Sequence, residues 1–143
     1  MFLGEFSHSL DDKGRVVMPR KFRSGLERGC VITKGQERCL YVFPMERWDE
    51  EAGRVLKLPR TDRRARNYSR SFFASATDQM LDRQGRVQIP EALRAYAGLE
   101  KDVTVVGVAD RIEVWSASVW NEVAAEADDF YAGIEEVLSG DGI

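Results

Sequence analysis

The hydrophobic and polar positions of the chain follow one pattern twice, with glycine and proline between short apolar runs. Alternating and short continuous apolar runs predict four strands in each series. The predicted strands are residues 2–10, 15–18, 30–33 and 40–43 in the first series and residues 72–81, 86–89, 103–108 and 112–115 in the second. After the second strand, Pro19 and Pro90 stand where a first helical position favours proline, and Gly25 and Gly98 stand where a helix end favours glycine. A short helix is therefore predicted in each series.

An amphipathic helix is predicted to close each series, because apolar residues recur there at helical spacing. The apolar face consists of Met45, Trp48, Ala52, Val55 and Leu56 in the first helix and of Val119, Val123, Ala127, Phe130, Ile134 and Val137 in the second. We expect the first face to pack in the core. The second face is long enough to pack either in the core or on another subunit.

The two series also share their residues, which indicates an internal duplication. The stretch LDDKGRVVMP at residues 10–19 recurs as LDRQGRVQIP at 81–90, and GLE at 25–27 recurs at 98–100. CLYVFPMERWDE at 39–50 is echoed by RIEVWSASVWNE at 111–122. Because the offset stays nearly constant over these matches, the chain is interpreted as two copies of one module.

Four short strands and a short helix make a poor core alone, so the two modules are expected to interleave into one β-barrel with pseudo-two-fold symmetry. The fold class is therefore mainly β, with helices flanking the barrel. The predicted organisation is a first module over residues 1–57, a basic connecting segment over 58–71, a second module over 72–138 and a tail over 139–143.

Charge is distributed unevenly along the chain. The 21 basic and 24 acidic residues give a net charge of −3, but seven of the acidic residues and no lysine or arginine lie from Asn121 onward. The body up to residue 120 therefore carries 21 − 17 = +4. Between Arg54 and Arg70 there are seven basic residues and one acid, Asp62. This stretch is either a solvated linker and helix surface or a patch that follows phosphates.

The repeated Asp-x-x-Gly-Arg stretch is the candidate site. Its carboxylate can accept backbone N–H bonds and its glycine supplies a positive φ, so the turn holds the following arginine firmly. Such an arginine can pair with a phosphate or with guanine, which is worth about 1 to 3 kcal/mol of base discrimination. The candidate DNA-binding residues are Arg15, Arg86, Lys13, Arg83, Arg20 and Lys21, and the turn-supporting residues are Asp11, Gly14, Asp82 and Gly85. Alternatively, each Asp–Arg pair is a salt bridge that only stiffens a hairpin.

Other chemistry finds little support in the sequence. GxGxxG, GxxxxGK[ST], GxSxG and HExxH are absent, so neither catalysis nor a cofactor or small-molecule substrate is expected. One histidine, His8, and two cysteines are too few for a zinc cluster, and His8 is expected in a solvated loop. Cys30 and Cys39 either form a cross-strand disulfide or are small buried hydrophobes. No apolar run of membrane-spanning length and no secretion signal appears, so a cytoplasmic protein is expected.

These stretches resemble the MraZ family, the bacterial regulators of the division and cell-wall gene cluster, within the AbrB-like DNA-binding superfamily. The resemblance rests on MFLGEFSHSLDDKGRVVMPRKFR, CLYVFP and LDRQGRVQIPEALRAYAGL. The two Asp-x-x-x-Arg motifs of the family fall on Asp11 with Arg15 and on Asp82 with Arg86.

The resemblance implies a double-split, swapped-hairpin β-barrel with helices outside and a homo-oligomer that forms a closed ring. It also implies binding to double-stranded DNA at repeated sites upstream of the family's own operon, and hence association with the nucleoid. Two alternatives remain at this point, an antitoxin-type DNA-binding module and a protein-only ring scaffold.

Overall fold

The strands and helices alternate along the chain much as the pattern predicts. The computed structural model describes residues 1–134, so residues 135–143, which include Val137 and the predicted tail, lie outside the described part. The elements of the first half are β1 (Phe2–Ser9), β2 (Arg15–Val17), α1 (Arg20–Arg23), η1 (Ser24–Leu26), β3 (Cys30–Lys34), η2 (Gln36–Arg38), β4 (Leu40–Pro44) and α2 (Met45–Leu56). They continue as α3 (Arg63–Ala74), β5 (Thr77–Gln79), β6 (Arg86–Gln88), α4 (Glu91–Tyr96), β7 (Asp102–Ala109), β8 (Arg111–Ser116) and α5 (Ala117–Gly133).

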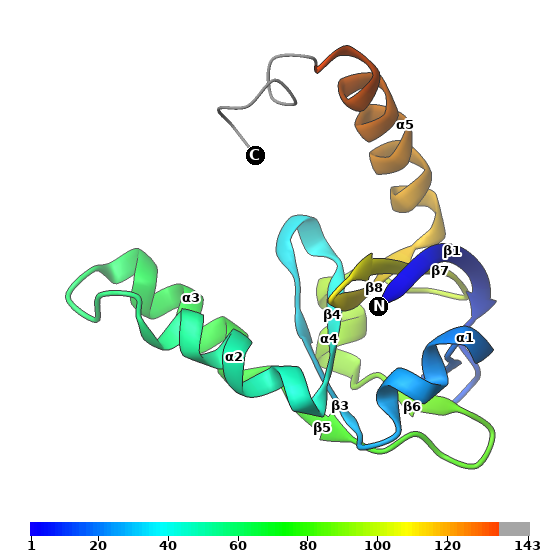
Figure 1. Cartoon of the computed structure of the whole chain (residues 1–143), viewed down its shortest axis with the longest axis horizontal. Helices are drawn as coiled ribbons and strands as arrows, with labels where there is room; N and C mark the ends of the chain where they lie inside the picture. The colour runs from blue at the N-terminus through cyan, green and yellow to red at the C-terminus, as the bar shows by residue number, and fades with distance from the viewer. Residues whose placement is uncertain (135–143) are drawn as a thin grey trace.

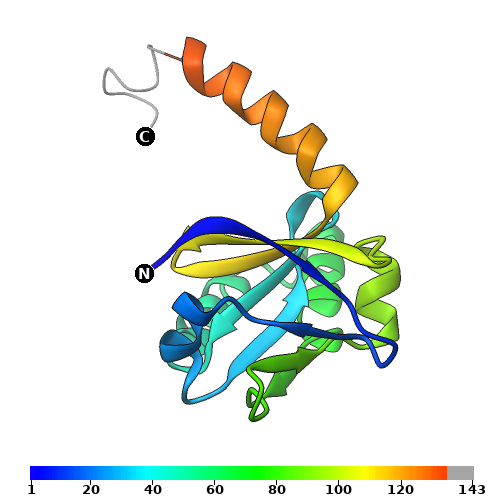
Figure 2. The same ribbon diagram turned by 90° about the vertical axis from the view of Figure 1, so that its right-hand side faces the viewer.

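The two halves of the chain interleave in the sheet (Figures 1 and 2). The main sheet has six strands in the order β1-β7-β8-β4-β3-β5, and β2 and β6 form a separate two-stranded ribbon. Four strand pairs join one half to the other, namely β1 with β7, β2 with β6, β3 with β5 and β4 with β8. Neither half therefore has a complete sheet of its own.

The expected closed β-barrel is not what the described residues form, because the six-stranded sheet is open. Its edge strands β1 and β5 are not paired with each other. The strands that could have joined the edges, β2 and β6, are only three residues long and hydrogen-bond to each other instead. The architecture is an open antiparallel sheet with a covering ribbon and flanking helices.

A pseudo-two-fold axis relates β2 to β6 in the two-stranded ribbon. Arg15 pairs with Gln88, Val17 pairs with Arg86, and Val16 faces Val87 between them. On either side, Met18 donates its N–H to the Gly85 carbonyl and Ile89 donates to the Gly14 carbonyl, both at 2.8 Å. Met18 matches Ile89 and Gly85 matches Gly14 in the sequence repeat, so the two copies make equivalent hydrogen bonds.

The main hydrophobic core lies between the ribbon, the sheet and the short helices. Val16, Met18, Val87 and Ile89 are each at most 2% exposed. Phe22 of α1 is also buried there and meets the rings of Phe2 and Phe6 edge-on. The core thus draws its side chains from both halves, so neither half buries it alone.

Helices α2 and α3 pack against each other and against one end of the sheet. The rings of Trp48 and Phe72 stack with centroids 5.3 Å apart, and Val55 is buried. The expected face of α2 is wrong at Leu56, the last residue of the helix, which is 61% exposed. The expected strand over residues 72–81 is wrong at its start, where Phe72 continues α3 and its ring packs on Trp48.

Helix α5 leaves the sheet and extends away from it (Figure 1). At its first turn Trp120 packs on Trp115 and donates its indole N–H to the Glu5 carboxylate at 2.8 Å. Further along, Phe130 and Tyr131 are 67% and 75% exposed. The core alternative is therefore wrong for the far half of this helix within the described residues.

The remaining expectations concern single residues. Cys30 and Cys39 are both buried and free, which excludes the disulfide and leaves them as small core residues. His8 is half-buried in β1 and does not lie in a loop. Burial, together with the charge of nearby Arg23, lowers the pKa of His8. Among residues 1–134 no helix is long and apolar enough to span a membrane.

Candidate nucleic-acid interface

The first Asp-x-x-x-Arg motif folds into a turn that its aspartate organises. Oδ1 of Asp11 accepts the backbone N–H groups of Lys13 and Arg15, both at 2.9 Å. Oδ2 accepts the side-chain Nε–H of Arg15 at 2.7 Å. A backbone bond from Gly14 to the Asp11 carbonyl closes the turn, and Gly14 has φ +73°. Because this φ strains any residue with a Cβ, glycine suits the position.

The second motif repeats this geometry. Oδ1 of Asp82 accepts the backbone N–H groups of Gln84 and Arg86 at 2.9 Å, and Oδ2 accepts the Nε–H of Arg86 at 2.7 Å. Gly85 has φ +75° and donates to the Asp82 carbonyl at 2.9 Å. The expectation that Asp11, Gly14, Asp82 and Gly85 support the turns is therefore consistent with every bond in both of them.

Both aspartates are stabilised as anions. The hydrogen bond from the backbone N–H of Arg15 has the largest effect in lowering the pKa of Asp11, and the Arg15 side chain adds to it. The backbone and side chain of Arg86 lower the pKa of Asp82 in the same way. At neutral pH each turn therefore contains a carboxylate that is ionised and fully engaged.

The arginine side chains do not project freely from the turns, because the Asp–Arg salt bridge that was expected as the alternative is present in both. Each is held along its aspartate as an ion pair, with 29% of the Arg15 side chain and 24% of the Arg86 side chain exposed. In this arrangement Nε is engaged. The Nη groups of Arg15 have no hydrogen-bond partner among residues 1–134, so they remain able to bind an external acceptor.

The ribbon brings the two arginines to one place. Nη1 of Arg86 lies 3.9 Å from Oδ2 of Asp11, which is the oxygen that accepts Nε–H of Arg15. Gln88 also donates its side-chain amide to the carbonyl of Lys13 in the first turn, at 3.1 Å. Arg15 and Arg86, which are 71 positions apart in the sequence, thus lie close together. We call the surface formed by these two arginines and their turns the paired-turn face.

The other predicted cations are solvent-exposed. They are Lys13 and Arg83 within the turns, and Arg20 and Lys21 at the start of α1. Lys21 also lies 5.9 Å from the centroid of the Phe6 ring. No salt bridge with an acid is formed by any of these four within the described chain, so their charge is free for phosphate contacts.

Two arginines outside the candidate set, Arg23 and Arg94, support the turns from behind. Arg23 donates Nε–H to the Met18 carbonyl at 3.0 Å, and Arg94 donates to the Ile89 carbonyl at 2.5 Å. Arg23 packs on Gly85 of the other half and Arg94 packs on Gly14, each where a Cβ would clash. Both arginines occupy matching positions of the repeat, so its register was the signal that could have identified them.

Comparison with known proteins adds an independent result. The family model described as "MraZ protein, putative antitoxin-like" matches residues 1–71 and again residues 72–138. The "Transcriptional regulator MraZ" of Salinispora tropica is 52% identical over 141 residues, covering 98% of this chain and 99% of the relative. The proteins of that name from Thermobifida fusca and Moorella thermoacetica are 50% and 48% identical, over 141 and 138 residues that cover at least 96% of each chain.

Proposed function

The chain belongs to the MraZ family of transcriptional regulators, and we propose that it binds double-stranded DNA upstream of its own division and cell-wall operon through the paired-turn face. The observation that carries this proposal is the convergence of Arg15 and Arg86, each fixed by its aspartate, on one surface. A side chain already held in place loses little conformational entropy on binding. The aspartates thereby prepare the arginines for contact.

The geometry supports different roles for the two motif arginines and for the other cationic residues. With Nε bonded to the aspartate, each arginine presents its Nη groups to guanine O6 and N7 or to a phosphate oxygen. The exposed cations Lys13, Arg83, Arg20 and Lys21 supply phosphate contacts, which position the protein without reading sequence. The Asp–Arg bond and the DNA contact use different nitrogens, so stiffening the turn and binding DNA are compatible roles.

We also propose that the interleaved halves are a swapped-hairpin arrangement of the AbrB-like type, with modules at residues 1–57 and 72–138 joined by residues 58–71. The exchange of strands between halves supports this assignment. In a ring of several copies, the paired-turn faces repeat at regular intervals. Linking weak contacts in this way raises the overall affinity by about 10² to 10⁴, so the target is proposed to be several short direct repeats.

A salt titration tests DNA binding by the whole chain. DNA from upstream of the protein's own gene is titrated at two salt concentrations by electrophoretic mobility shift, beside an unrelated duplex of equal length. We expect tighter binding to the upstream DNA and a steep loss of affinity with salt, because phosphate contacts release counterions. Absence of binding at both concentrations would instead favour the protein-only ring scaffold.

The repeat proposal has its own test on the same DNA. Equivalent contacts on one face of B-DNA recur about every 10 to 10.5 base pairs. Affinity should therefore rise steeply from one repeat to three, fall when five base pairs are inserted between repeats and recover when ten are inserted. A single repeat that binds as tightly as three would refute the repeat proposal but not DNA binding itself.

If the protein binds DNA as proposed, it is cytoplasmic and associated with the nucleoid.

A further inference from the structure

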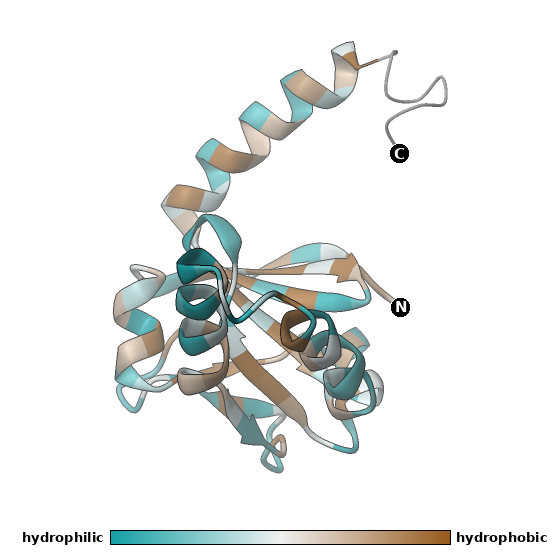
Figure 3. Ribbon diagram, turned by 90° about the vertical axis from the view of Figure 1, so that its left-hand side faces the viewer, coloured by the Kyte–Doolittle hydropathy of each residue, from teal (hydrophilic) through white to brown (hydrophobic). Residues whose placement is uncertain are grey.

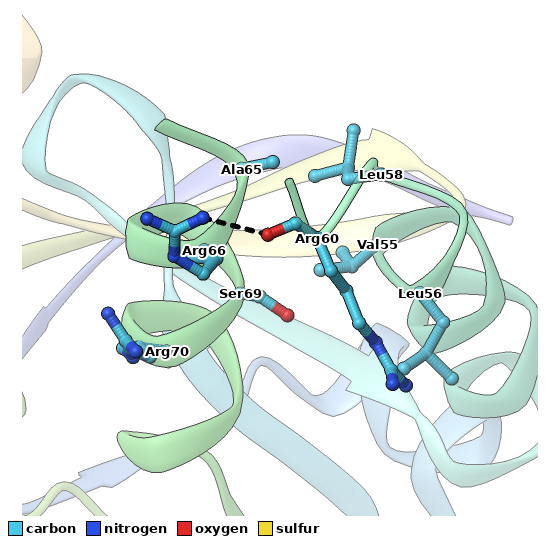
Figure 4. A pocket seen from close by; sticks show the side chains of 8 residues that line it. All are labelled: Val55, Leu56, Leu58, Arg60, Ala65, Arg66, Ser69 and Arg70. Atoms are coloured by element: carbon cyan, nitrogen blue, oxygen red, sulfur yellow. Dashed lines mark hydrogen bonds between the residues drawn. The ribbon is translucent and has the colours of Figure 1, made fainter. Parts of the chain in front are cut away.

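The hairpin of α2 and α3 carries a hollow whose lining is part apolar and part cationic (Figure 4). The cavity has a volume of about 340 Å³. Val55, Leu56 and Leu58 line its apolar side, and Arg60, Arg66 and Arg70 lie around it. A second hollow of about 590 Å³ shares Val55 and Leu58 and reaches Tyr68. We call these two adjoining hollows the hairpin groove.

The charge of the hairpin is mostly unneutralised. Arg54 pairs with Glu50 and Glu51, and Arg64 pairs with Asp62. The other five basic residues between Arg54 and Arg70 form no salt bridge with any described residue; they are Lys57, Arg60, Arg63, Arg66 and Arg70. The surface therefore attracts an anionic partner.

Exposed apolar side chains in the hairpin groove indicate what kind of anionic partner fits there. Leu56, Leu58 and Tyr68 are 61%, 38% and 40% exposed. A surface that contacts only DNA phosphates does not require exposed leucine side chains. Arginine beside exposed apolar and aromatic side chains is instead typical of protein interfaces. The hairpin tip also lies well away from β6 and the turn before it (Figure 1). These features favour an acidic protein segment with apolar anchors over DNA.

Helix α5 has this complementary chemistry. Between Asn121 and Gly133 it contains four acidic residues and no lysine or arginine, and none of the four forms a salt bridge within the described chain. The acidic residues are Glu122, Glu126, Asp128 and Asp129. Phe130 and Tyr131 stand among them, largely exposed. Figure 3 shows this helix clear of the sheet, with hydrophobic and hydrophilic residues alternating along it.

The sequence repeat relates α5 to α2. Trp48 of α2 and Trp120 of α5 occupy matching positions, and α3 packs on α2 through the Trp48–Phe72 stack. Within the described residues nothing packs in the same way on the far half of α5. Trp120 also fixes the start of α5 through Trp115 and Glu5, and from there the helix extends beyond the sheet (Figure 1).

We propose that the far half of α5 docks in the hairpin groove of a second copy of this chain, with Phe130 and Tyr131 against the apolar lining and the acids facing the free arginines. The two surfaces are different parts of the molecule, so the contact is head-to-tail. Head-to-tail contacts generate closed rings when the rotation between subunits closes. The inference thus names the interface of the ring that is part of the proposed function, and it stands apart from DNA binding.

Charge reversal with rescue tests the interface in the full-length protein. Arg60→Glu with Arg70→Glu changes two exposed groove residues, and Asp128→Lys with Asp129→Lys changes the opposing helix. Sedimentation velocity should show that each double variant dissociates at a protein concentration at least tenfold higher than the wild type. The fourfold variant, in which both charges are reversed, should regain assembly. Arg28→Glu, an exposed arginine outside the groove, is the control and should assemble normally.

A second variant probes the apolar part. Phe130→Ala with Tyr131→Ala should dissociate the assembly in the same way, and its thermal unfolding should stay close to that of the wild type because both side chains are exposed. The inference is overturned if the wild type is monomeric, if the groove and helix variants assemble normally, or if the fourfold variant fails to recover. It is also overturned if the groove variant keeps its assembly and loses DNA affinity, since the hairpin would then be a DNA contact.

DNA titrations of the same proteins separate this inference from the proposed function. Normal assembly of every variant with intact DNA binding would refute the interface alone. Loss and rescue of assembly, combined with a wild type that does not bind DNA, would refute the proposed function and support the interface.

Discussion

Val16 and Val87 lie directly opposite each other in the β2–β6 ribbon, and the pseudo-two-fold relation between the halves passes between them. Both are buried, at 0% and 2% exposure. Flanking pairs place Arg15 and Arg86 at equivalent distances from this point. The packing of two small side chains at the centre of the ribbon therefore determines how the two Asp-x-x-Gly-Arg turns are placed relative to each other.

The pairing of Val16 with Val87 predicts that substitutions at the two positions lower stability by similar amounts and that their effects depend on each other. Val16→Ala and Val87→Ala should each lower the free energy of unfolding by about 2 kcal/mol, from lost burial and the cavity left behind. Because the residues face each other, the double variant should depart from additivity by about 0.5 kcal/mol or more. Urea denaturation measures all three. Val119→Ala, at an exposed position on α5, is the control and should lower the free energy of unfolding by no more than about 0.5 kcal/mol. Clearly unequal losses of stability for Val16→Ala and Val87→Ala would contradict the pseudo-symmetry.

The turn glycines make a second prediction. Gly85→Ala should cost more stability than Gly98→Ala, although both glycines have positive φ, +75° and +60°. A Cβ at Gly98 meets open space, so the substitution measures backbone strain alone, about 1 to 2 kcal/mol. At Gly85 the Cβ would displace Arg23 from the Met18 carbonyl, adding about 1 kcal/mol. Thermal unfolding ranks the two, and equal losses would mean that Arg23 moves aside at no cost.

The turn aspartates predict how stability depends on acid. Their pKa is lower in the folded protein than the ordinary 3.8, so their stabilising effect is complete above that value and is lost as the pH falls through the folded-state pKa. The double variant Asp11→Asn with Asp82→Asn should therefore lose less stability than the wild type on acidification below about pH 4. Thermal unfolding against pH measures the difference. Asp12→Asn removes a neighbouring charge that accepts no such bond and should follow the wild type; parallel curves for all three proteins would contradict the assignment.

Much of the fold was predictable because the relevant signals are local. The Asp-x-x-Gly-Arg spacing predicted the bonds from Lys13 and Arg15 to Asp11, since they connect residues at most four apart. The repeat predicted that the halves interleave. Proline and glycine positions marked α1 and α4 to within a few residues.

Other features depend on contacts between distant parts of the chain. The start of α3 is not evident from apolar periodicity, which residues 63–67 lack; the local signal for it is the Asp62 cap, which accepts the N–H of Arg64. Whether the sheet closes depends on strand lengths and edge pairing, which spacing does not reveal. The approach of Arg86 to Asp11 exists only because β2 pairs with β6.

The most direct test of the paired-turn face is the affinity of Arg15→Ala, Arg86→Ala and their double variant for DNA from upstream of the protein's own gene, measured by fluorescence anisotropy. Each single variant loses an ion pair on a solvent-screened surface, and such pairs contribute little to stability, so thermal unfolding should change little. Each should bind the DNA at least tenfold more weakly, and the double variant should bind no better than it binds unrelated DNA. Wild-type affinity in the double variant, with a lowered unfolding temperature, would show that the two arginines only stiffen their turns and would contradict the account.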